Sequence, residues 1–181
     1  MNTHILFFQG GGGQEDHEAD AKMVASLQSH LGSNYEIHYP LLPNEEAPDF
    51  GRLKQIAHEI SVSQEPLILV AHSLGASMLL KYLSEVKNTK KITGVFLIAT
   101  PFWSGKEDWE KPLTLKPDFA ERLDQQIPLF FYHCRDDQEV PFDQFELYKK
   151  CLPWATFHDM PSGGHQLDNG LKAIAHHIDS I

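Results

Sequence analysis

Cysteine is scarce in this sequence, and its many histidines lack the spacing of metal ligands. The two cysteines, Cys134 and Cys151, form no C-x-x-C pair, so we expect neither a disulfide framework nor a zinc knuckle, but two reduced and buried thiols. The eleven histidines include no H-E-x-x-H or comparable motif. We therefore predict that the protein holds no metal.

Long apolar runs and basic clusters are also missing. The apolar run near the N-terminus, residues 5–8, is too short for a membrane span, and no Lys or Arg precedes it as in a signal peptide. The formal net charge of −10 would repel nucleic acid phosphates and anionic lipids. We expect a cytoplasmic protein that binds no nucleic acid and does not insert into membranes.

Short apolar segments alternate with segments whose apolar residues recur at helical spacing. With 181 residues, of which 41% are hydrophobic, the chain suits a single domain over residues 1–181. The alternation predicts an α/β three-layer sandwich with a mostly parallel sheet and reactive groups at the carboxyl ends of its strands. The expected strands are 5–8, 35–39, 67–71, 92–99, 129–133 and 155–158, and the expected helices lie around 19–31, from 48 to about 63, and at 74–86, 142–152 and 171–178.

Residues 100–126 break this alternation with a long, proline-containing stretch that carries Trp103, Trp109 and Phe119. A loop of this length inside a compact domain is usually functional or mobile, and exposed aromatic side chains generally cover something. We predict a small cap or active-site loop in which Trp103 and Trp109 bind the substrate. The alternative is a helical excursion that only covers the sheet.

Ser73 stands where a buried strand turns at once into a helix, within LILVAHSLGASMLL at 67–80. A serine at such a joint is typical of the nucleophile elbow, G-x-S-x-G, which here has alanine first: Ala71-His72-Ser73-Leu74-Gly75. The elbow would hold Ser73 Oγ above the sheet and aim the Leu74 N–H into the same space as an oxyanion donor. The alternative is that Ser73 only caps the helix.

An elbow serine needs an acid and then a histidine further along the chain. Asp137 is our candidate acid because D-x-x-V-P lets Val140 anchor its loop in the core, and Asp136 is the alternative. His165 is the candidate base, since the glycine pair before it permits a turn back over the sheet. For His72 we expect a structural role.

The glycine run 10–13 follows the first strand. It lacks the G-K-[ST] and G-x-G-x-x-G patterns of nucleotide loops, and the acids Glu15 and Asp16 would repel phosphate, so we predict no cofactor. The run would instead complete an oxyanion hole through the N–H of Gly11, with Gly12 as the alternative. A flexible turn without a ligand is the remaining interpretation.

With these motifs in order, the chain resembles the α/β-hydrolases, and in detail the small YdeN-like and retinoblastoma-binding-type serine hydrolases. The resemblance rests on residues 7–12, 71–75, 136–142 and 163–165. It implies a minimal α/β-hydrolase fold and a Ser73–Asp137–His165 triad that cleaves a small-molecule ester-like substrate, a carboxylester first and a thioester or amide otherwise, through an acyl-enzyme. Ala71 and Gln9 depart from the commoner glycine and histidine.

A second hypothesis comes from another class of protein. A fold never guarantees a function, so the same residues could serve a ligand-binding or protein-binding role with little turnover. We therefore retain a protein partner as an alternative to the ester-like substrate.

Overall fold

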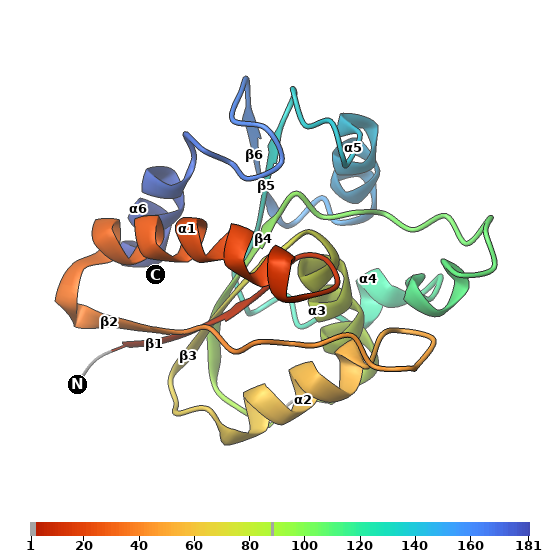
Figure 1. The fold of residues 1–181 in the computed structure, drawn as a ribbon, viewed down its shortest axis with the longest axis horizontal. Helices are drawn as coiled ribbons and strands as arrows, with labels where there is room; N and C mark the ends of the chain where they lie inside the picture. The colour runs from red at the N-terminus through yellow and green to blue at the C-terminus, as the bar shows by residue number, and fades with distance from the viewer. Residues whose placement is uncertain (1–2, 88) are drawn as a thin grey trace.

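The computed structural model describes residues 3–87 and 89–181, which form one six-stranded sheet with helices on both faces (Figure 1). The strand order is β2-β1-β3-β4-β5-β6, and every pair of neighbouring strands is parallel. The expected α/β sandwich is confirmed, with a sheet that is wholly parallel. The strands are β1 (Thr3–Phe8), β2 (Tyr35–His38), β3 (Leu67–His72), β4 (Ile92–Ile98), β5 (Leu129–Cys134) and β6 (Thr156–Met160).

Two apolar layers hold the helices against the sheet. Ile68 and Val70 of the central strand β3 face the layer beneath α1 and α6, whereas Leu69 and Ala71 face the layer beneath α2 and α3. Alternate side chains point to opposite faces of a strand, so β3 is buried along its whole length. The helices are α1 (Gln14–Leu31), α2 (Arg52–Val62), α3 (Ser73–Glu85), α4 (Phe119–Arg122), α5 (Phe142–Cys151) and α6 (Leu171–Asp179), with short 3-10 turns η1 (Gly32–Asn34) and η2 (Lys111–Leu113).

The second helix begins later than its apolar pattern suggested. It starts at Arg52 rather than at residue 48, because Phe50 and Gly51 take left-handed backbone conformations with φ of 57° and 77°. Asp49 then acts as a cap, since its carboxylate accepts the N–H groups of Gly51 and Leu53 at 3.1 and 3.0 Å. This acid therefore lies one turn before the first residue of α2, at the positive end of the helix dipole.

Two predictions of burial were wrong. The i+4 spacing of Ala19, Met23 and Leu27 predicts that Ala19 lies on the inner face of α1, but Ala19 is exposed, and the neighbouring Asp20 is buried in its place. Cys151, expected to be buried, is exposed at the end of α5, whereas Cys134 is buried as expected. Burial raises the pKa of the Cys134 thiol to about 12, and nearby carboxylates including Asp136 add to this, so that thiol is unreactive at neutral pH.

The segment 100–126 runs along one side of the molecule and carries η2 and α4 (Figure 1). Leu113, Phe119 and Leu123 are buried against α3, so this stretch is anchored by apolar contacts and is not a free loop. Within the described residues, none of the helices is long and apolar enough to cross a membrane.

Candidate active site

Ser73 is the first residue of α3 and has a left-handed backbone, with φ of 49°. A residue other than glycine seldom adopts this conformation, and such strain collects at functional sites. The N-cap of α3 is His72, and no side chain caps the helix, so capping does not explain the serine. Packing explains the glycine at position 75, because a Cβ there would lie 2.1 Å from the Gln9 carbonyl oxygen.

Ser73 opens into a cleft of about 380 Å³. The residues predicted to bind the substrate and the oxyanion line this cleft together with the serine: Gly11, Leu74, Trp103 and Trp109. Trp103 is held in place, because its Nε1–H donates to Ser77 Oγ at 2.9 Å, and it packs edge to face on Trp109 with ring centroids 5.5 Å apart. Trp109 itself is 54% exposed, which leaves this wall of the cleft open to solvent.

Asp137 and His165 are in direct contact. Asp137 follows β5 and His165 follows β6, two neighbouring parallel strands whose carboxyl ends share one edge of the sheet. His165 Nδ1 lies 2.9 Å from Asp137 Oδ2, and the backbone N–H groups of Glu139 and Val140 donate to Asp137 Oδ1 at 2.8 and 2.9 Å. Val140 is buried as expected, so the carboxylate sits on an anchored loop.

The pKa shifts of Asp137 and His165 both favour an ion pair between these two side chains. Burial by itself raises the pKa of Asp137, but hydrogen bonds from His165, Val140 and Glu139 outweigh it and hold the pKa below its ordinary value. Burial lowers the pKa of His165, yet the hydrogen bond and charge of Asp137 outweigh that effect and raise the pKa above 6.5. Both shifts favour a carboxylate beside an imidazolium.

Asp136 has a different partner from Asp137. Its two carboxylate oxygens accept the N–H groups of Gly163 and Gly164 at 3.3 and 2.9 Å. Both glycines have positive φ, of 139° and 63°, so the turn before His165 uses conformations that other residues rarely adopt. Asp136 therefore shapes the histidine loop, while Asp137 contacts the imidazole.

His165 lies beside the elbow without a hydrogen bond to the serine. His72 Nε2 is 2.9 Å from the carbonyl oxygen of His165, and the two imidazole rings are 4.6 Å apart. Among the described residues, Ser73 Oγ has no hydrogen-bond partner, and His165 Nε2 faces the Glu139 carboxylate at 3.5 Å. Hydrogen bonds between a nucleophile and its base are often long in a free enzyme and tighten when substrate binds.

The glycine run offers two unoccupied backbone donors. The Gly10 N–H donates to Asp20 at 2.7 Å and the Gly13 N–H to Asp16 at 3.1 Å. In the described part of the chain, the N–H groups of Gly11 and Gly12 find no acceptor, and of the two Gly11 lines the cleft. Its N–H and that of Leu74, in the first turn of α3, are the candidate oxyanion donors.

Three polar residues near the site could not be assigned to it from the sequence alone. His133 is buried and bonds the Val140 carbonyl at 2.9 Å, and burial lowers its pKa, which favours the neutral ring. Glu139 lies in the cleft, where nothing in its spacing marked it. Asp20 lies on the inward-facing side of α1, three residues before the buried Met23, and this helical spacing is the feature of the sequence that could have indicated its burial.

The parallel sheet and the strand–serine–helix elbow define an α/β-hydrolase fold. Residues 42–177, more than half of the 181 residues, match the family model described as serine hydrolase. The chain belongs to the serine hydrolase family.

Solved structures agree on the fold. A putative hydrolase of the α/β superfamily from Xanthomonas campestris is 18% identical, with all of both chains covered and a TM-score of 0.65. The ydeN gene product of B. subtilis is 17% identical, with 99% of this chain and 98% of that one covered and a TM-score of 0.68. A lipase-esterase related protein from Clostridium acetobutylicum is 15% identical, with 98% and 93% covered and a TM-score of 0.69. Among curated proteins there is no match.

Proposed function

We propose that this serine hydrolase cleaves small carboxylic esters through an acyl-enzyme on Ser73. The observation that carries the proposal is the left-handed backbone of Ser73, which opens into a cleft shared with the unoccupied donor Gly11 and with Leu74. The Asp137–His165 pair at the same edge of the sheet supplies a base for it. Strain at a serine, free donors and an oriented imidazole together favour nucleophilic catalysis.

The reaction would run in two steps, acylation and deacylation. In acylation, His165 Nε2 takes the Ser73 proton as Oγ bonds to the ester carbonyl carbon, and the imidazolium then returns that proton to the departing alcohol as the C–O bond breaks. In deacylation, His165 Nε2 takes a proton from water as the water oxygen bonds to the acyl carbon, and returns it to Ser73 Oγ as the bond between Oγ and that carbon breaks, which releases the acid and restores the serine. Asp137 would orient the imidazole and stabilise its cation, and the N–H groups of Gly11 and Leu74 would bind the oxyanion.

The composition of the cleft narrows the substrate class. Its lining is aromatic at Phe102, Trp103 and Trp109, and its charged residues are the carboxylates Glu110 and Glu139, with no Lys or Arg among the lining residues described. Carboxylates repel anions, and aromatic faces bind apolar or cationic groups. We infer an ester with an apolar or aromatic group and without a negative charge. A thioester or amide would need the same groups.

A ligand-binding protein on this fold is the second candidate. The observation that favours it is the Glu139 carboxylate at 3.5 Å from His165 Nε2, the nitrogen that must accept the serine proton. Should that carboxylate stay in place when ligand binds, the imidazole would be engaged and turnover would be slow.

Labelling with a fluorophosphonate probe, together with turnover of p-nitrophenyl esters of varied acyl length, separates the two candidates. The parent protein and Ser84→Ala, a serine variant further along the same helix, should be labelled and should turn over ester. Ser73→Ala should do neither. A parent protein that is folded but neither labelled nor active would favour the binding protein. Trp103→Ala or Trp109→Ala should change the acyl-length preference, and an unchanged preference would remove the cap hypothesis for 100–126.

A further inference from the structure

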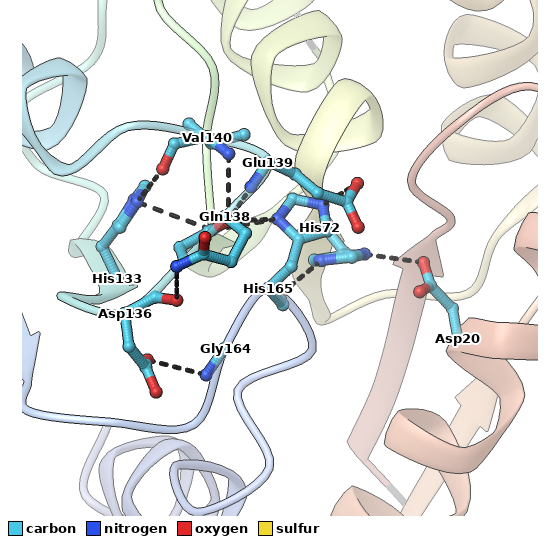
Figure 2. Close-up of polar contacts among 10 residues, drawn as sticks. Asp20, His72, His133, Asp136, Gln138, Glu139, Val140, Gly164 and His165 are labelled. Carbon is cyan, nitrogen blue, oxygen red and sulfur yellow. Dashed lines mark hydrogen bonds and ion pairs between the residues drawn. The ribbon is translucent and has the colours of Figure 1, made fainter.

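A second buried acid–histidine pair lies next to the site. Asp20 of α1 and His72 at the end of β3 are each 1% exposed, and His72 Nδ1 is 2.9 Å from Asp20 Oδ2 (Figure 2). The proposed reaction uses neither group. Burying an acid and an imidazole is costly unless both are fully hydrogen-bonded, so the pair needs a reason.

The contacts of this pair reach three separate segments. Asp20 Oδ2 also accepts the N–H of Gly10, at 2.7 Å, and the far nitrogen of the His72 ring, Nε2, is 2.9 Å from the carbonyl oxygen of His165. Gly10 precedes the oxyanion candidate Gly11, and His72 precedes Ser73. One carboxylate thus connects the glycine run, the elbow and the histidine loop.

The protons on the His72 ring follow from its two neighbours. A carbonyl oxygen can only accept, so the contact with His165 requires a proton on His72 Nε2. The contact with Asp20 requires a second proton, held between Nδ1 and Oδ2. Burial raises the pKa of Asp20, but the hydrogen bond and charge of His72 and the hydrogen bond from Gly10 outweigh it and hold that pKa below its ordinary value, so the carboxylate accepts the bond from His72.

The fit around these contacts is close. A Cβ at Gly10 would lie 2.9 Å from His72 Nδ1 and 3.2 Å from Ser73 Cβ, so the glycine run touches the elbow directly. Movement of the Asp20 carboxylate would therefore displace the backbone of the oxyanion run and the ring that holds His165.

We propose that Asp20, acting through His72, is a positioning residue that fixes His165 and the oxyanion glycines relative to Ser73, an inference that rests on the proposed hydrolase function. The Asp137 contact orients the ring of His165 by its Nδ1, whereas the Asp20–His72 contact fixes the backbone from which that ring extends. Together they hold the imidazole at two points. A misplacement of about 1 Å in such a group can cost on the order of a hundredfold in rate.

Asp20→Asn tests this because the amide lacks the negative charge that faces the two protons which the His72 ring needs for its two contacts. If the amide oxygen takes the Oδ2 position, it accepts from Gly10 and His72, but a ring that carries a single proton, on Nδ1, then has none to donate to the His165 carbonyl. If the amide nitrogen takes that position, it opposes the Gly10 N–H, donor against donor. Asp16→Asn is the matched control, since Asp16 lies on the same helix and accepts a glycine N–H, but is exposed and has no contact with His72.

The measurement is kcat per active site for p-nitrophenyl butyrate, with sites counted by fluorophosphonate titration so that unfolded molecules do not contribute. We expect Asp20→Asn to lower kcat by about tenfold to a hundredfold with KM changed much less, and Asp16→Asn to stay within about threefold of the parent. In a double-mutant cycle, Asp20→Asn combined with His72→Gln should be no worse than the more impaired single variant, since both break one chain of contacts.

A kcat per titrated site within about twofold of the parent would overturn the inference, as would fully additive effects in the cycle. An inactive, unlabelled parent would instead count against the proposed function. Should Asp20→Asn not fold, nitrogen-15 spectra of histidine in the parent protein decide the matter. They should show a proton on His72 Nε2, the nitrogen that faces the His165 carbonyl oxygen, and an unprotonated Nε2 would overturn the proposal.

Discussion

Replacing Asp137 by asparagine should nearly abolish turnover while leaving the fold intact. In the parent, Asp137 Oδ1 accepts the N–H groups of Glu139 and Val140, at 2.8 and 2.9 Å, and Oδ2 faces His165 Nδ1 at 2.9 Å. The two backbone donors would fix the amide oxygen of the variant at the Oδ1 position. The amide NH2 would then point at His165 Nδ1 and force that nitrogen to act as an acceptor, which puts the ring proton on Nε2.

That tautomer is the wrong one, because Nε2 must be free to take the serine proton. In a serine protease, the corresponding change lowers kcat by about 10⁴, and we expect a loss of about 10³ to 10⁴ here. At about 1.4 kcal/mol per factor of ten, this is about 4–5.5 kcal/mol of lost transition-state stabilisation. Because asparagine keeps the shape of aspartate and both backbone bonds, the free energy of unfolding should fall by no more than about 1–3 kcal/mol.

The assay is the steady-state hydrolysis of p-nitrophenyl butyrate, with urea unfolding as the check of the fold. Asp136→Asn is the control, since Asp136 binds the two loop glycines and not the imidazole, and it should lose less than about tenfold. A folded Asp137→Asn protein that keeps activity within about tenfold of the parent would refute the tautomer reasoning. A large loss confined to Asp136→Asn would transfer the role of the acid to Asp136.

Two further predictions follow from the same geometry. The value of kcat/KM should rise with pH and reach half of its plateau above pH 6.5, because the neutral imidazole is the active form and Asp137 raises the pKa of His165. A profile with its midpoint at or below pH 6.5 would contradict this prediction. Gly75→Ala should destabilise the protein, because the added Cβ would lie 2.1 Å from the Gln9 carbonyl oxygen. Overpacking of this kind costs about 1–3 kcal/mol or more, which exceeds the gain of about 1 kcal/mol in helix propensity. Gly13→Ala, where a Cβ meets nothing within 4 Å, is the control in urea unfolding, and equal losses in the two variants would exclude the packing explanation.

Much of the fold could be read from the chain because it depends on local periodicity. The continuous apolar run of β3 and the helical spacing after Ser73 are properties of neighbouring residues, and both elements lie within a residue or two of where they were predicted. The later start of α2 was not visible, because it depends on left-handed conformations at Phe50 and Gly51, and the apolar pattern carries no information on φ.

The candidate site likewise combines features that short-range sequence arguments indicate with features that depend on distant contacts. Asp137 was preferred to Asp136 from the Val140 anchor, a short-range argument, and the structure joins Asp137 to His165 while Asp136 binds the loop glycines. Their catalytic roles stay predictions that the variants above test. Glu139 could not be found from the sequence, because its place in the cleft depends on how the loop after β5 meets the segment 100–126.

The sequence by itself determined the order of strands and helices, the sharp turn at Ser73 and the glycine-bearing loops, because each depends on residues close together in the chain. Only the tertiary structure decided that Asp20 is buried beside His72, fifty-two positions away, and that this ring reaches His165, a further ninety-three positions along the chain. The physical reason is that a hydrogen bond acts only at contact distance. Which distant groups come into contact is set by the packing of α1 and the histidine loop on the parallel sheet.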